Sequence, residues 1–304
     1  MALTVTVLGC GTSMGVPMIG CRCAVCTSRD PRNHRTRPAV HLRTETTALL
    51  IDAPPELRLQ LIRSQLDTHL DAVLITHTHA DHIMGLDDVR GFTLRTNRPI
   101  PVYAEASALD DLKRVYRYVF FPYPPGVSTP QIEFREITGV FTIGDITVEP
   151  LRVFHGEMPI LAFRVGNFAY VTDVSYIPPD TWERLQGLEL LILDALRYQP
   201  HPTHYNLEQA IEVAQKLGAK RTLFTHMTHD FDYETVNAQL GASYVTGPNA
   251  SGRDGRTHIL GTDLVVKWRP LTNDRGWPFV TFQAELMGRR YEADGFSLCL
   301  DEED

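Results

Sequence analysis

The first half of the chain alternates apolar segments of strand length with segments of helical spacing. Runs of apolar or alternating residues predict strands at residues 4–8, 39–42, 47–51, 72–75 and 101–103. Apolar residues recur every three or four positions in the segments between them, which predicts helices at residues 55–65, 82–90 and 107–120. This order is typical of a chain that builds a sheet with helices packed on it.

From Gly139 the chain becomes strongly β. Strands are predicted at residues 140–143, 146–153, 160–165 and 168–172, and Gly144-Asp145 and Gly166-Asn167 are two-residue turn signals that predict hairpins. Helices at residues 179–185, 207–217 and 233–240 then alternate with strands at residues 190–193 and 221–225. Two β-rich halves that each carry helices predict an α/β fold, a four-layer αββα sandwich, in which loops at one edge converge on a site.

The C-terminal part is predicted to be a separate addition. We expect residues 1–247 to form the main domain and residues 248–304 a small antiparallel β extension, packed on or near it, with short apolar segments at 259–260, 264–268, 279–284 and 296–300. Residues 251–255 are a plausible linker. The extension could extend the sheet, mediate a homodimer or line a pocket, and the sequence does not choose among these.

Composition restricts the possible partners. The 304 residues carry a net charge of -8, which argues against general affinity for nucleic acid or for anionic membranes. No twenty-residue apolar segment occurs and the first residues lack the basic start of a signal peptide, so a cytoplasmic location is expected. The segment from Arg22 to Arg43 contains six arginines and only one acidic residue, Asp30. That loop could guide an anionic substrate, or it could be a solvated basic loop.

Metal-binding side chains cluster after the predicted strand at residues 72–75. His77, His79, Asp81 and His82 lie within six residues, and imidazoles with a carboxylate are ligands for zinc, manganese or iron. A histidine-rich surface loop is the alternative. Three further candidates each follow a predicted strand, and they are His155, Asp173 and His226.

The cysteines predict a second kind of metal site. Cys21, Cys23 and Cys26 form a C-x-C-x2-C cluster, and His229 lies three residues beyond His226. Three thiolates and one imidazole make a closed tetrahedral zinc site of the structural kind. Three close thiols cannot pair evenly as disulfides, although buried or redox-active thiols are a further alternative.

Together the glycine-rich opening after Gly9, the cysteine cluster and the H-x-H-x-D-H segment resemble the metallo-β-lactamase superfamily, and within it the PhnP-type phosphodiesterases, which open five-membered cyclic phosphates. The resemblance covers residues 4–229. It implies two divalent cations, zinc or manganese with iron and nickel as further candidates, in addition to the structural zinc. The implied ligands are His77, His79 and His155 for one cation, Asp81, His82 and His226 for the other, and Asp173 between them.

The resemblance also implies an activity. A small anionic phosphodiester, such as a cyclic phosphate, would be hydrolysed by attack of metal-bound hydroxide, with Asp81 and His204 as catalytic residues. Asp194 could orient a ligand histidine or cap a loop. Three alternatives stay open: an RNA 3′-processing nuclease, a thioester hydrolase of the glyoxalase II kind, and a metal-binding scaffold without catalysis.

Overall fold

The structure is a computed structural model that describes residues 2–124, 126–244, 266–268 and 280–282. The chain divides into two compact units, and the division falls after Tyr233. The first unit contains two six-stranded mixed sheets. None of the helices in the described part of the chain combines the length and the apolar character needed to cross a membrane.

The first sheet follows the order of the sequence from β1 to β6. Its strands are β1 (Thr4–Gly9), β2 (Ala39–Arg43), β3 (Ala48–Ile51), β4 (Ala72–Leu74), β5 (Ile100–Ala104) and β6 (Ile132–Glu136). The first three strands pair antiparallel and the others pair parallel. The carboxyl ends of β3 to β6 therefore share one edge of this sheet.

The second sheet has the order β12-β11-β10-β9-β8-β7. Its strands are β7 (Phe141–Ile143), β8 (Ile146–His155), β9 (Met158–Val165), β10 (Phe168–Val171), β11 (Leu190–Asp194) and β12 (Arg221–Thr225). The strands from β7 to β10 are antiparallel, as the two turn signals predict, and β10, β11 and β12 are parallel. Both sheets thus change from antiparallel to parallel pairing along their order.

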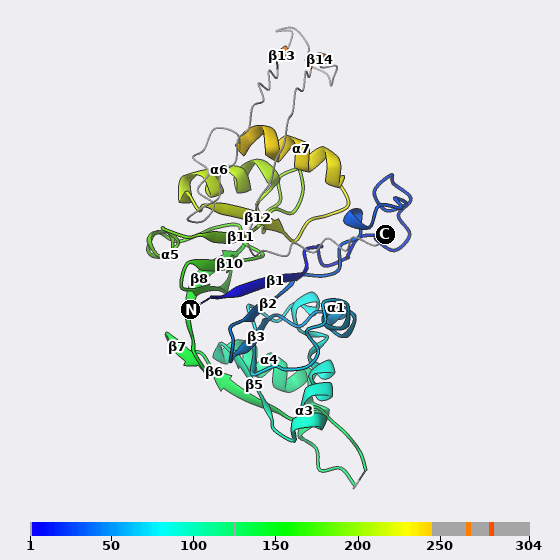
Figure 1. Ribbon diagram of the computed structural model, residues 1–304, viewed down its shortest axis with the longest axis vertical. Helices are drawn as coiled ribbons and strands as arrows, with labels where there is room; N and C mark the ends of the chain where they lie inside the picture. The colour runs from blue at the N-terminus through cyan, green and yellow to red at the C-terminus, as the bar shows by residue number, and fades with distance from the viewer. Residues whose placement is uncertain (1, 125, 245–265, 269–279, 283–304) are drawn as a thin grey trace. The chain divides into compact units, whose positions relative to one another are not determined.

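Helices cover the outer face of each sheet, as Figure 1 shows. On the first sheet these are α1 (Leu57–Arg63), α3 (Arg90–Thr96) and α4 (Ala106–Val115). On the second sheet they are α5 (Pro179–Arg184) and α6 (Leu207–Leu217), which contact β8 and β11. The predicted α/β four-layer sandwich, the metallo-β-lactamase fold, is confirmed.

Alternation along the strands separates the two hydrophobic cores. Leu49 and Ile51 of β3 lie in the core between the sheets, together with Phe163 and Tyr170 of the other sheet, whereas Leu50 lies in the core beneath the helices. A strand turns successive side chains to opposite faces, so a run of apolar residues fits a strand that is covered on both sides. The apolar run at residues 47–51 encodes this arrangement.

The predicted helix at residues 82–90 is wrong. The chain instead forms the short α2 (Ala80–Ile83), a 3-10 turn at Leu86–Val89 and then α3, which the sequence analysis missed along with β6. At Gly85 an added Cβ would lie 1.9 Å from the carbonyl oxygen of Pro54, so the chain passes directly against the segment after β3. This close backbone approach breaks the helix, and local spacing does not reveal it.

Other short elements refine the predicted boundaries. The predicted helix at residues 107–120 ends at Val115 and continues as a 3-10 turn at Arg117–Phe120. A further 3-10 turn at Pro31–Asn33 lies in the loop between β1 and β2.

The second unit begins at Glu234. The helix α7 (Tyr233–Tyr244) spans the division, and β13 (Val266–Trp268) pairs antiparallel with β14 (Val280–Phe282). The predicted boundary at residues 247/248, the predicted linker and the predicted strands at 259–260 and 296–300 lie outside the described residues. The division into a main domain and a β extension therefore stays a prediction.

Candidate metal centre

Loops at the carboxyl ends of several strands carry the predicted ligands. The segment that contains His77 to His82 follows β4, His155 ends β8, Asp173 follows β10, and His226 follows β12. Because parallel neighbours in a sheet end at the same edge, residues far apart in the sequence are brought together there. The structure brings all seven predicted ligands into one cluster, in which five are buried, His155 is half-buried and His79 is exposed.

The backbone at this edge has an uncommon conformation. Asp52 and His226 directly follow the last residues of β3 and β12, and Asp173 lies two residues after the end of β10; their φ angles are 64°, 61° and 53°. Left-handed backbone is uncommon for residues other than glycine, although aspartate and histidine tolerate it better than most. Such conformations cost free energy and cluster at functional sites. Here they turn each side chain into the cluster within two residues of the end of its strand.

The first group of candidate ligands contains His77, His79 and Asp173, whose ligand atoms lie within 4.8 Å of one another. His77 Nε2 is 3.0 Å from His79 Nδ1 and 3.8 Å from Asp173 Oδ2. The His155 ring lies beside this group, with its centroid 5.1 Å from that of His79. This grouping agrees with the ligand set that the resemblance implies for one cation.

The second group contains Asp81, His82 and His226. Asp81 Oδ2 is 3.3 Å from His82 Nε2 and 3.2 Å from His226 Nε2. Asp173 also lies 3.3 Å from both of these imidazole nitrogens, through Oδ1 to His82 and through Oδ2 to His226. The Asp173 carboxylate therefore lies between the two groups, as a bridging ligand would.

The side chains fit divalent cations. His82 Nε2 is buried and hydrogen-bonds to no described residue, although it lies 3.3 Å from both Asp81 and Asp173. Among the described residues no lysine or arginine forms an ion pair with buried Asp81 or Asp173. The charged or chargeable partners of these two carboxylates are imidazoles alone. Burial by itself would lower the pKa of His82 and of His226, but the negative charge of Asp173 outweighs burial and raises both pKa values. Cations bound here would displace those protons and use the same lone pairs.

The other protonation states also suit metal binding. Burial lowers the pKa of His77, His79 and His155, which keeps these imidazoles neutral near pH 7. Burial alone would raise the pKa of a carboxyl group, but hydrogen bonds and charge from neighbouring imidazoles hold the pKa of Asp81 and Asp173 below the usual range. Neutral imidazoles and ionised carboxylates are the ligand forms that divalent cations require.

Asp52 is a supporting residue that the sequence analysis missed. It is fully buried and Oδ2 accepts a hydrogen bond from His82 Nδ1 at 2.8 Å, while Oδ1 accepts one from Thr76 N at 2.9 Å. An acceptor on the second nitrogen fixes the tautomer of a ligating histidine. The only sequence signal is an acid directly after the apolar strand at residues 48–51.

Asp194 and His204 form a buried pair at the end of β11. His204 Nδ1 is 3.0 Å from Asp194 Oδ2, which also accepts a hydrogen bond from Tyr205 N at 3.2 Å. Burial lowers the pKa of His204 to about 4 and raises that of Asp194. His204 Nε2 lies 4.0 Å from Asp173 Oδ2, so the predicted catalytic histidine reaches the cluster. Asp194 orients His204 and also lies beside His226.

The cysteine cluster forms as the sequence predicts. The Sγ atoms of Cys21, Cys23 and Cys26 lie 3.2, 3.3 and 3.5 Å from His229 Nδ1. A tetrahedral zinc with Zn–S of about 2.3 Å and Zn–N of about 2.0 Å places these atoms about 3.5 Å apart, so the geometry fits zinc. A backbone hydrogen bond from Cys26 lowers the pKa of the Cys23 thiol to about 6.

The loop that carries the cysteines is joined to the metal-binding edge. Thr12 N donates to Met227 O at 3.0 Å and Met227 N donates to Cys10 O at 2.8 Å, so the segment after β1 pairs with the segment between His226 and His229. An added Cβ at Gly11 would lie 2.5 Å from the carbonyl oxygen of Arg35, and only glycine fits this crossing. Backbone hydrogen bonds thus hold the start of the cysteine-containing loop beside the residue that follows His226.

Several of the arginines between Arg22 and Arg43 make contacts within the fold. Buried Arg35 donates to the carbonyl oxygen of Phe231 at 2.7 Å, Arg37 pairs with Glu56, and Arg32 pairs with Asp30. Arg22, Arg29 and Arg43 are exposed. Guidance of a substrate by this loop stays a prediction.

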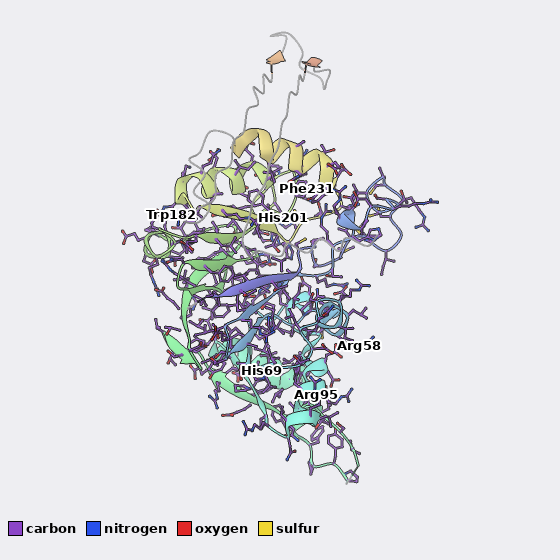
Figure 2. All side chains as sticks on the ribbon, in the orientation of Figure 1. Arg58, His69, Arg95, Trp182, His201 and Phe231 are labelled. Carbon is purple, nitrogen blue, oxygen red and sulfur yellow. The ribbon has the colours of Figure 1, made fainter. Side chains whose placement is uncertain are left out.

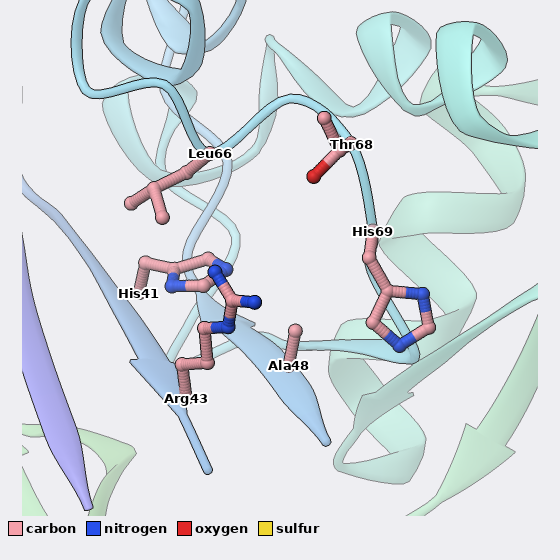
Figure 3. A pocket seen from close by; sticks show the side chains of 6 residues that line it. All are labelled: His41, Arg43, Ala48, Leu66, Thr68 and His69. Atoms are coloured by element: carbon pink, nitrogen blue, oxygen red, sulfur yellow. The ribbon is translucent and has the colours of Figure 1, made fainter. Parts of the chain in front are cut away.

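A small pocket lies at the other edge of the first sheet, and Figure 3 shows the side chains that line it. It has room for about one water molecule, roughly 10 Å³, between His41, Arg43 and His69. Both ring nitrogens of buried His41 lack a hydrogen-bond partner among the described residues. Because Ala48 and His69 precede or begin the strands whose far ends carry Asp52 and His77, this pocket is separate from the metal cluster.

Comparison with known proteins identifies the family. The beta-lactamase superfamily domain matches residues 47–227. The chain is similar to a diphosphatase from the PhnP family whose crystal structure is known. The two share 43% sequence identity and superimpose with a TM-score of 0.73, over 79% of this chain and 91% of that one. It is 30% identical over 224 residues to coenzyme PQQ synthesis protein B of a Methylobacterium species, which is 63% of this chain and 72% of that protein.

A third relative is longer. The chain is 41% identical over 259 residues to an octanoyltransferase of Porphyromonas gingivalis, a match of 83% of this chain that spans about half, 51%, of that protein. The chain therefore belongs to the metallo-β-lactamase superfamily. Within the superfamily it is similar to the PhnP family, as its motifs predict.

Proposed function

We propose that the chain hydrolyses small phosphoric diesters, cyclic phosphates among them, at this centre. The observation that carries the proposal is the position of Asp173, which lies 3.3 Å from His82 and His226 and 3.8 Å from His77. One carboxylate between two sets of imidazoles is the arrangement expected for a pair of neighbouring cations. The similarity to a PhnP-family diphosphatase supports chemistry at phosphorus.

The residues divide into two ligand sets that share Asp173. His77, His79 and His155 would hold one cation, and Asp81, His82 and His226 the other. When bound, two divalent cations supply positive charge and lower the pKa of coordinated water toward about 7. Asp81 and Asp173 contribute two negative charges, so a net positive charge remains for an anionic phosphodiester. Zinc and manganese are our first candidates, because mixed nitrogen and oxygen ligands suit both.

His204 would complete the reaction. Water attacks phosphorus, the bond from phosphorus to the departing oxygen breaks, and that oxygen needs a proton. Asp194 holds His204 through Nδ1 and leaves Nε2 facing the cluster. When the ring is doubly protonated, a form that the negative charge of a bound phosphate favours, Nε2–H can hydrogen-bond a phosphoryl oxygen and protonate the departing oxygen. Proton transfer of this kind contributes about a hundredfold or more in rate. Asp81 acts through its carboxylate as a ligand for a cation.

A second candidate substrate is a diphosphate, in which the departing oxygen belongs to another phosphoryl group. The name of the similar PhnP-family protein, a diphosphatase, favours it. The same residues would serve, because both substrates present a phosphoryl group with a departing oxygen. RNA is a weaker candidate, since the net charge of -8 offers no general attraction for a polyanion.

We also propose that Cys21, Cys23, Cys26 and His229 hold a structural zinc. The distances between sulfur and nitrogen support this, and a closed set of four ligands leaves no position for a substrate. The cytoplasmic location and the homodimer that the sequence analysis considered stay predictions.

The test is an assay of the purified protein against a substrate panel. Manganese- or zinc-loaded protein would be offered five-membered and six-membered cyclic phosphates, a linear aryl diester, a nucleoside diphosphate, structured RNA and a thioester. We expect cleavage of a cyclic phosphate or diphosphate that Asp81→Ala abolishes. Cleavage of the thioester alone, or of RNA alone, would refute the proposal, as would wild-type protein that binds both cations and cleaves nothing.

A further inference from the structure

His201 lies beside the proposed catalytic histidine without an assigned role. It belongs to the loop between β11 and α6, is half-buried, and its ring centroid is 5.2 Å from that of His204. The His204 ring is in turn 4.5 Å from that of His155. Figure 2 labels His201 in the second half of the sandwich. The His204 ring therefore lies against the rings of both His155 and His201.

The hydrogen bonds of Thr203 fix the tautomer of His201. Thr203 N donates to His201 Nδ1 at 3.3 Å, and Thr203 Oγ1 lies 3.2 Å from the same nitrogen. A backbone N–H group can only donate, so Nδ1 must carry the lone pair. The proton of the neutral ring is therefore on Nε2. No described residue accepts a hydrogen bond from His201 Nε2.

The same threonine holds His201 in a fixed relation to the metal ligands. The carbonyl oxygen of Thr203 lies 2.8 Å from His155 Nδ1, so its two backbone groups orient both imidazoles. The turn after His155 packs directly on this residue, because an added Cβ at Gly156 would lie 2.9 Å from Thr203 Cγ2. An Nε2–H donor is thus held beside the centre with nothing in the described fold to bond to.

We propose that His201 is a specificity-determining residue whose Nε2–H donates to an oxygen of the substrate's departing portion. The inference rests on the proposed function and narrows its substrate class. A substrate with an oxygen-rich departing group, such as a sugar cyclic phosphate or a diphosphate, offers this acceptor next to the phosphoryl group under attack. A diester with an apolar aryl departing group does not.

Kinetics with two substrates test the proposal. We expect His201→Ala to raise KM for a ribose-type cyclic phosphate about tenfold or more, because one hydrogen bond to the substrate is lost. The same variant should leave kcat/KM for a diphenyl phosphate within about threefold of wild type. His201→Gln keeps an N–H donor of similar reach and should recover most of the loss. His69→Ala, a histidine at the opposite edge of the first sheet, is the matched control and should change neither substrate.

Nitrogen-15 NMR of the histidine rings gives a readout that needs no substrate. The resting protein should show His201 protonated at Nε2, and a ring protonated at Nδ1 would overturn the proposal. Equal losses on the two substrates would also overturn it, because they indicate a structural role. If wild-type protein is active and His201→Ala is unchanged, this inference alone fails. If wild-type protein cleaves no phosphate substrate, the proposed function fails and the inference fails with it.

Discussion

The substitution Asp52→Asn tests how the fold prepares His82 to bind a cation. In the protein Asp52 Oδ2 accepts from His82 Nδ1 at 2.8 Å and Oδ1 accepts from Thr76 N at 2.9 Å. Asparagine has the same size and tolerates the left-handed backbone at this position. Its oxygen must remain toward the Thr76 N–H, so its amide N–H group faces His82. His82 then has a lone pair on Nδ1 and a proton on Nε2. Because a cation binds His82 through a lone pair on Nε2, this tautomer opposes metal binding.

The expected loss follows from this forced tautomer. Removal of an acceptor behind a ligating histidine lowers metal affinity about 10- to 100-fold. That range corresponds to about 1.4 to 2.7 kcal/mol of binding free energy. Asp52 and His82 are both fully buried, so water cannot replace the lost acceptor, and we expect the upper part of the range. The cysteine cluster should retain its zinc, because none of its ligands contacts Asp52.

The assay is competition with a chelator at pH 7.5, with the metal content of the protein measured at each concentration. Asp71→Asn is the matched control, because Asp71 accepts from Ala48 N and pairs with His69 at the opposite edge of the same sheet. It should leave metal affinity unchanged. Equal dissociation constants for wild type and Asp52→Asn would refute the reasoning, and so would an equal loss in Asp71→Asn.

Three further outcomes are expected. His204→Ala should lower kcat for a cyclic phosphate about a hundredfold while the two catalytic cations stay bound, and a loss of metal in that variant would contradict the assigned role. Cys21→Ser should lower the free energy of unfolding by at least about 2 kcal/mol, which corresponds to roughly 4–8 °C in Tm, and the protein should lose one zinc. The control variant Cys10→Ser should keep that zinc. Burial, with the charges of Arg43 and His69, lowers the pKa of His41 to about 4, so the unfolded chain binds a proton that the folded one excludes. Stability should therefore fall by about 2 kcal/mol from pH 7 to pH 5, and urea unfolding of His41→Leu should lack this part of the loss.

Local pattern was sufficient where a single segment carries the signal. The apolar run at residues 47–51 predicts a strand buried on both faces, and Leu49 and Leu50 do lie in different cores. The turn signals at Gly144 and Gly166 predict hairpins that the structure contains. These features depend on residues next to one another in the chain, so the sequence encodes them directly.

The pattern failed where distant backbone intervenes. The helix expected at residues 82–90 is broken because Gly85 passes against Pro54, a contact that periodicity does not show. Asp52 could not be singled out, because an acid at a strand end is more often a turn residue. Its role exists only through His82, thirty residues away.

The sequence by itself determined the chemistry available to this protein, since its spaced histidines, aspartates and cysteines are metal ligands wherever they meet. Only the tertiary structure decided that Asp173 lies between two sets of imidazoles and that Thr203 orients both His155 and His201. The physical reason is that strand ends from both sheets meet at one edge. The ligands that surround Asp173 are 53 to 96 positions away from it in the chain. Such distances depend on sheet order and pairing, and no short segment of the chain contains that information.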